Sequence, residues 1–129
     1  MNDKSDSNSE FIEKIKLMKI GDVIAELVLE LRFPDGRIED VEIKLGKPVL
    51  VDETDAACIV ECKGPIPIGR QFIGVGTFLT LATAIFSICS FIERFIKNTK
   101  CEIHWFGEKI DVEEIKSCFS MISDPRTDI

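Results

Sequence analysis

The chain has 129 residues, of which 45% are apolar and 30% are charged, so it can bury one hydrophobic core and is not a disordered chain. It carries 16 basic and 23 acidic residues, a net charge of −7, and the whole excess lies in the segment 22–62, with eleven acidic and four basic residues. An acidic segment repels phosphate, which argues against nucleic acid as a partner and favours a basic protein surface.

The cysteines and the chain ends indicate where the protein works. The chain has five cysteines, Cys58, Cys62, Cys89, Cys101 and Cys118, and none of them forms a C-x-x-C pair. An odd number without such pairs is typical of unpaired thiols in a reducing compartment, so we expect a cytoplasmic protein. The first ten residues are polar and contain no apolar signal core. We expect tails at 1–8 and 124–129 around a single domain at 9–123, which opens with a short amphipathic helix at 9–19.

Residues 22–45 predict an antiparallel hairpin. Apolar residues occupy every second position from Val23 to Phe33, and charged residues lie between them, interrupted by Ile24 and Val28, which is the period of a strand. The next four residues, Pro34-Asp35-Gly36-Arg37, predict a turn. Proline presets φ at the first turn position, and glycine accepts the positive φ that follows. Residues 38–45 alternate again, so one face of the hairpin is apolar and the other is wet.

Three further strands are expected, at 56–63, 66–75 and 101–106, and residues 49–51 could resume the second strand after Gly46-Lys47-Pro48. Asp111 is placed to cap a last helix, with Glu114 three residues later in the capping-box position. The apolar stripe of that helix comprises Val112, Ile115, Phe119 and Ile122.

Residues 77–98 form the dominant feature, a 22-residue helix without internal glycine or proline. The uncharged stretch 72–92 is long enough to be a transmembrane candidate. However, Gly74 and Gly76 predict a corner between a strand and the helix, and the uncharged helical part then covers about 24 Å of a roughly 30 Å hydrocarbon core. The apolar face of the strands also needs a cover, so we favour a core helix, with a single membrane span as the alternative.

Small polar residues recur on this helix at three- and four-residue steps and predict one polar face, comprising Thr80, Thr83, Ser87, Ser90 and Arg94. Such a face is either thinly solvated or a close-packing surface for a second copy of the chain. The apolar residues from Phe78 to Phe95 are expected to cover most of the remaining surface of the helix.

No catalytic, cofactor or metal site is expected. His104 is the only histidine, and its C-x-x-H spacing with Cys101 matches two of four zinc ligands at most, on opposite faces of a strand, so a surface or half-buried histidine is the simpler reading. No cysteine has a cationic neighbourhood that would activate it. An enzyme remains a third reading, and it would need a pocket that gathers His104 with a thiol or carboxylates.

The wet face of the hairpin is the best candidate for recognition. It carries Glu26, Glu30, Asp40 and Glu42, partly neutralised by two basic residues, Arg32 and Lys44. We expect these four carboxylates to steer a basic partner toward this face.

Three short motifs carry a resemblance over about residues 22–95. They are Pro34-Asp35-Gly36, the step Leu45-Gly46-Lys47-Pro48, and the helix opening from Gly74 to Ala82. The chain resembles a family of small bacterial domains of uncharacterised function, in which an aspartate stands where this chain has Gly76. The resemblance implies a sheet with one covering helix and a binding role, because such proteins are suspected of being immunity partners of toxins. It supplies no catalytic residue.

Together these patterns predict an α+β domain, with a mainly antiparallel sheet of four or five strands, one long helix on its apolar face and short terminal helices. The expected function is that of a non-enzymatic, acidic protein-binding module, an inhibitor or immunity protein against a basic effector. The alternative is a single-pass membrane protein with residues 72–92 as the span.

Overall fold

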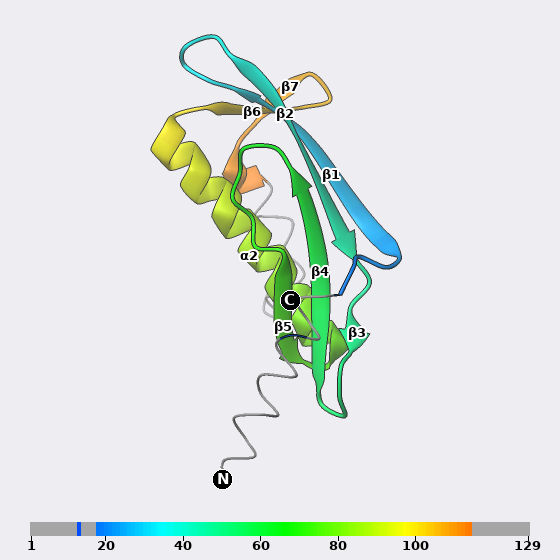
Figure 1. Cartoon of the computed structure of the whole chain (residues 1–129). Helices are drawn as coiled ribbons and strands as arrows, with labels where there is room; N and C mark the ends of the chain where they lie inside the picture. Colours follow the sequence, from blue (N-terminus) through cyan, green and yellow to red (C-terminus); the bar gives the residue numbers. More distant parts are fainter. Residues whose placement is uncertain (1–12, 14–17, 115–129) are drawn as a thin grey trace, which may run out of the picture.

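The computed structural model describes residue 13 and residues 18–114 of the chain. The elements follow in the order β1 (Val23–Arg32), β2 (Ile38–Gly46), β3 (Val49–Leu50), β4 (Asp55–Lys63), β5 (Gln71–Val75), α2 (Gly76–Thr99), β6 (Glu102–Trp105) and β7 (Glu108–Ile110). All strand pairs are antiparallel, and α2 lies across one face of the sheet (Figure 1). The predicted α+β class is therefore confirmed.

The sheet has seven strands, in the order β3-β4-β2-β1-β6-β7, with β5 paired to β4. At Ala56 and Ala57, β3 and β5 flank β4 on opposite edges, whereas β2 pairs with its last four residues. The prediction of four or five strands was too low, because β3 has two residues and β7 three, and such short strands show no period. The expected strand at 66–75 begins only at Gln71.

The hairpin turn follows the prediction. Gly36 has a φ of +92°, and its N–H donates to the carbonyl of Phe33 at 3.0 Å. The N–H of Arg37 donates to the Asp35 carboxylate at 2.9 Å. Thus glycine occupies the position that needs positive φ, and aspartate closes the turn locally.

The apolar face of β1 becomes more deeply buried along the strand. Ala25 is exposed, Leu27 is half-buried, and Leu29 and Leu31 are buried completely or nearly so. The buried end packs with residues from β2, β4, α2 and β6 in one core, which includes Val41, Val60, Ile92 and Ile103. Burial of each such side chain contributes about 1.5–3 kcal/mol, so this end of the sheet anchors the fold.

The predicted corner between strand and helix is present at Gly76. Its φ is +73°, and its N–H donates to the carbonyl of Thr54 at 2.7 Å. A Cβ on Gly74 would lie 2.9 Å from Thr80 Oγ1, so only glycine allows the first turn of α2 to approach β5 this closely. The four residues 72–75 of the uncharged stretch therefore belong to β5, and the helix proper begins at Gly76.

One predicted placement on α2 is wrong. Thr80 is completely buried, and its Oγ1 donates to the carbonyl of Gly76 at 2.7 Å, so this hydroxyl is satisfied within the helix and needs no solvent. Phe78, one of the apolar residues expected on the rest of the helix surface, is 75% exposed and takes no part in the core. The polar face is thus formed by Thr83, Ser87, Ser90 and Arg94 without Thr80.

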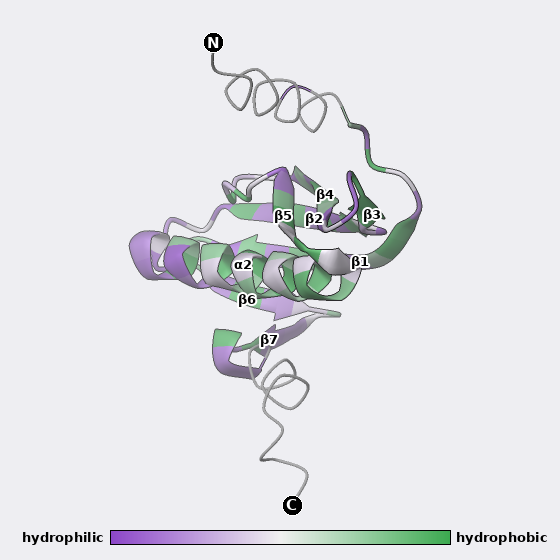
Figure 2. Cartoon of the chain, turned by 90° about the horizontal axis from the view of Figure 1, so that it is seen from below, coloured by the Kyte–Doolittle hydropathy of each residue, from purple (hydrophilic) through white to green (hydrophobic). Residues whose placement is uncertain are grey.

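By length and composition alone, α2 could cross a membrane, a criterion that core helices of soluble proteins also meet. Figure 2 shows it hydrophobic along most of its length and hydrophilic near its C-terminal end. One side of it, with Ala84, Ile88 and Ile92, packs into the core of the sheet.

The predicted terminal helices fall largely outside the described residues. Glu13 is helical, whereas residues 18–20 are not. Residues 112–114 begin the last helix, where the Glu114 N–H donates to the main-chain carbonyl of Asp111 at 3.0 Å. Cys118 and the stripe from Ile115 to Ile122 lie outside the described residues.

Candidate functional site

The acidic residues predicted for recognition lie on the outer face of the hairpin, opposite α2. Glu26 pairs with Lys44 across the two strands, Glu30 pairs with Asp40, and Glu42 pairs with Val28. Residues in these positions all point to the same side of the pleated sheet. The structure therefore brings the four carboxylates together on one face.

Most of these carboxylates have cationic neighbours. Lys44 Nζ lies 3.4 Å from Glu42 Oε1 and 3.9 Å from Glu26 Oε1, and Arg32 Nη2 lies 3.1 Å from Glu30 Oε2. Such exposed ion pairs are worth about 0–1 kcal/mol each, and their cations can exchange for those of a partner at little cost.

The pair Glu30–Asp40 differs from the rest of this face. Two carboxylates stand directly opposite each other in the ladder, and like charges in that position are destabilising. Arg32 pairs with Glu30, and no ion pair of Asp40 occurs among the residues that the structure describes. A positive charge from outside the chain would relieve this repulsion.

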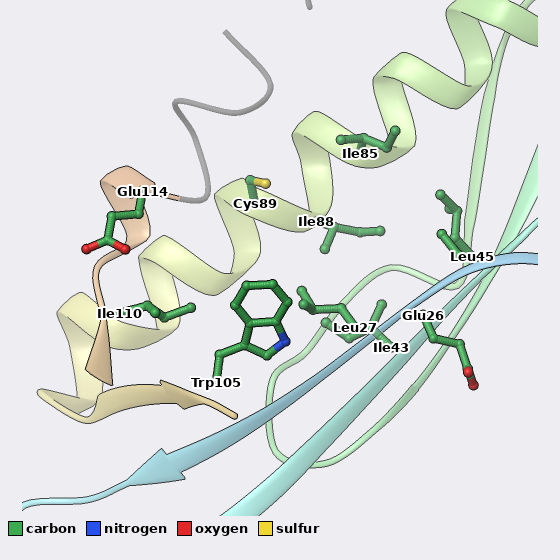
Figure 3. Close-up of a pocket in the computed structure, with 11 residues that line it drawn as sticks. Glu26, Leu27, Ile43, Leu45, Ile85, Ile88, Cys89, Trp105, Ile110 and Glu114 are labelled. Atoms are coloured by element: carbon green, nitrogen blue, oxygen red, sulfur yellow. The ribbon is translucent and has the colours of Figure 1, made fainter. Parts of the chain in front are cut away.

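An apolar groove of about 420 Å³ lies on the other face of the hairpin (Figure 3). Its floor comes from β1 and β2, one wall from α2, and the other from the β6–β7 hairpin and residue 114. The lining residues are Ala25, Glu26, Leu27, Ile43, Leu45, Ile85, Ile88, Cys89, Trp105, Ile110 and Glu114. A volume of this order is typical of binding sites for small molecules or a few side chains.

The groove exists because β6 covers only one end of β1. The pairing of β1 with β6 is limited to residues 30–32 of β1, and the chain then turns away at Phe106 and Gly107, both with positive φ. Among the described residues, no strand pairs with Val23–Leu29 on that edge. Unpaired backbone groups of β1 therefore run alongside the open groove.

The chemistry of the groove is asymmetric. Trp105 points into it between α2 and β1, whereas the carboxylates of Glu26 and Glu114 point outward at its two ends (Figure 3). No lysine or arginine is among its described lining residues. The groove thus combines an apolar interior with a negatively charged rim.

His104 is buried, contrary to the expected surface or half-buried position. Its Nε2 lies 3.3 Å from Glu102 Oε2, and its Nδ1 is buried without a hydrogen-bond partner among the described residues. The hydrogen bond from His104, followed by that from Lys109, holds the pKa of the Glu102 carboxyl below its ordinary value. His104 does not line the groove described above.

Two of the described thiols, Cys58 and Cys62, are less acidic than an ordinary cysteine. Burial raises the pKa of the Cys58 and Cys62 thiols, which lowers their thiolate fraction at neutral pH. Cys58 Sγ donates to the carbonyl of Gly46 at 3.2 Å, as a buried structural thiol does. Within residues 13 and 18–114, no group of three or more His, Cys, Asp or Glu side chains could hold a metal ion.

In comparisons with protein-family models, curated proteins and solved structures, no significant match to this chain was found. The resemblance to small bacterial domains therefore stays a prediction.

The sequence indicated the outer face and missed the groove. Alternation in β1 and β2 placed the four carboxylates correctly. The groove forms where Trp105 and Ile110 lie opposite Leu27 and Ile88. Leu27 on β1 and Trp105 on β6 are more than 70 positions apart in the sequence, so no local pattern relates them.

Proposed function

We propose that the chain is a non-enzymatic protein-binding module for a basic partner, which it contacts through the outer face of the β1–β2 hairpin. The observation that supports this most directly is the opposed pair Glu30–Asp40, a local repulsion that a lysine or arginine of a partner would remove. The concentration of the net negative charge in residues 22–62 adds steering toward such a partner.

The environments of two thiols and of the histidine support a binding role. The Cys58 and Cys62 thiols have raised pKa values, and the imidazole of His104 is buried against Glu102. An inhibitor or immunity protein against a basic effector is the particular form of this function that we propose, with the cytoplasm as its site of action.

The test uses the full chain as an affinity bait in lysate of its source cells. The variant Glu30→Lys/Asp40→Lys removes the opposed acids, and Asp22→Lys/Glu53→Lys makes the same change of net charge at exposed positions outside the β1–β2 ladder. We expect the unchanged chain and the Asp22/Glu53 control to retain basic proteins that the Glu30/Asp40 variant does not retain. These proteins should elute as the salt concentration is raised. Equal retention by all three baits would refute the proposal.

A second candidate is a membrane-associated protein, which the exposed apolar residues of α2 favour. Phe78, Leu79 and Phe86 are exposed large side chains on this helix. Fractionation of cells without detergent separates the two candidates: a binding module stays in the supernatant, whereas a protein held by a transmembrane α2 sediments with membranes and resists alkaline extraction.

A further inference from the structure

We propose that the open edge of β1 and the adjacent apolar groove accept an extended segment of the partner, which adds to the sheet as a strand. This inference rests on the proposed function and specifies how the basic partner is held. The segment has apolar side chains alternating with lysine or arginine.

The backbone supports strand addition. Residues Val23–Leu29 of β1 pair with β2 on one edge, and none of the described residues pairs with them on the other. These seven residues of strand span about 23 Å, enough to align several backbone hydrogen bonds. Unpaired edges of this kind bind extended segments, with main-chain hydrogen bonds supplying affinity and side-chain pockets supplying specificity.

The two faces of this edge select different side chains. On the inner side, Ala25 and Leu27 open onto the groove of about 420 Å³, whose lining is mainly apolar and includes Ile88 and Trp105. Apolar side chains of an added strand would enter it, because neighbouring strands point side chains to matching faces.

On the outer side, the regular part of this stretch presents Glu26 and Val28, whereas Ile24 lies at an irregularity of the β1–β2 ladder between Val23 and Ala25. The side chain of Val28 is 54% exposed, so it is accessible from this open edge. A lysine or arginine of the added strand would lay its aliphatic stem on Val28 and direct its charge to Glu26. The alternation of chemistry across the edge therefore matches one partner pattern, apolar inward and basic outward.

Charge argues against the other occupants. A fatty acid or an acidic segment would bring a negative charge to a rim formed by Glu26 and Glu114. A second copy of the chain that offered its own β1 edge would bring a second Glu26 to this negatively charged rim.

The direct test uses a synthetic peptide of about nine residues that alternates leucine and lysine, long enough to cover the open edge. Trp105 is the only tryptophan and lines the groove, so its fluorescence reports binding to the full chain without labelling. We expect saturable binding that weakens about tenfold or more when glutamate replaces lysine or when the leucines are made contiguous.

Backbone pairing is tested with two further peptides, one N-methylated at all leucines and one at all lysines. The N–H groups of alternate residues point to opposite edges of a strand, so strand addition predicts that one of the two peptides loses binding and the other keeps it. Equal binding by both methylated peptides would overturn strand addition.

Protein variants locate the site. Ala25→Phe fills the groove at an exposed position, and Val49→Phe is a matched control at an exposed position on β3. We expect at least a tenfold loss of peptide affinity only in the first, with circular dichroism unchanged in both. Three results would each overturn the proposal. They are peptide binding that Ala25→Phe does not change, equal binding of a simple long-chain amine, and concentration-dependent self-association that Ala25→Phe abolishes.

Failure of this inference and failure of the proposed function are distinguishable. If the Glu30/Asp40 bait loses its partners while the Ala25→Phe bait retains them, the acidic face binds and the groove does not. If the Glu30/Asp40 bait loses nothing, the proposed function itself fails.

Discussion

The contact between Gly74 and Thr80 permits a sharp test of how α2 is seated on the sheet. A Cβ on Gly74 would lie 2.9 Å from Thr80 Oγ1 and 3.3 Å from Thr80 Cα. The hydroxyl cannot easily move away, because Thr80 is completely buried and bonded to the carbonyl of Gly76 at 2.7 Å. We therefore expect Gly74→Ala to lower the free energy of unfolding by about 1–3 kcal/mol through overpacking.

A double-mutant cycle isolates this contact. Thr80→Ala removes the buried hydrogen bond and a methyl group, and should by itself cost about 1–2 kcal/mol. In the double variant Gly74→Ala/Thr80→Ala, the added methyl no longer meets Oγ1, although the contact with Cα at 3.3 Å remains. The combined cost should therefore fall short of the sum of the two single costs by about 1 kcal/mol.

The measurement is urea unfolding followed by circular dichroism and by Trp105 fluorescence. Gly21→Ala is the control, because a Cβ there meets nothing within 4 Å and the substitution should be neutral or slightly stabilising. The reasoning is refuted if the single costs simply add, or if Gly74→Ala costs no more than the control.

Three further predictions concern the core and the titratable groups. Leu31→Ala, at a completely buried position, should cost about 2–5 kcal/mol in urea unfolding, whereas Leu27→Ala, on the same face beside the groove, should cost less; equal losses would contradict the burial gradient along β1. Burial raises the pKa of the Cys58 thiol above 9.0, so the folded state retains its proton longer than the unfolded chain. The contribution of this thiol to stability is complete below about pH 9 and is lost at higher pH. Between pH 8 and pH 10, a Cys58→Ala variant should therefore lose less stability than the unchanged chain. Backbone N–H groups of Asp55 and Thr54 hold the pKa of Asp52 below 3.8, so its contribution is present above that pH and is lost on further acidification. Acid titration of Asp52→Asn should show a shallower loss of stability below about pH 4, and an unchanged slope would exclude this role.

The hairpin and the corner at Gly76 could be predicted from the sequence, because each depends on neighbouring residues. Alternation over β1 and β2 identifies both faces of the hairpin, and positive φ at Gly36 and Gly76 follows from local turn chemistry. The placement of Thr80 could not be predicted in this way. Its spacing from Thr83 and Ser87 suggests one polar face, but the hydroxyl is satisfied by its own helix and can be buried.

Local periodicity and composition by themselves determined the strands of the hairpin, the long apolar helix and the position of the negative charge. Tertiary structure alone decided that β6 pairs with only three residues of β1, and that a groove with an open strand edge results. The reason is that the length of a ladder between distant segments depends on where the second chain segment turns away. Neither segment carries that information in its own pattern of side chains.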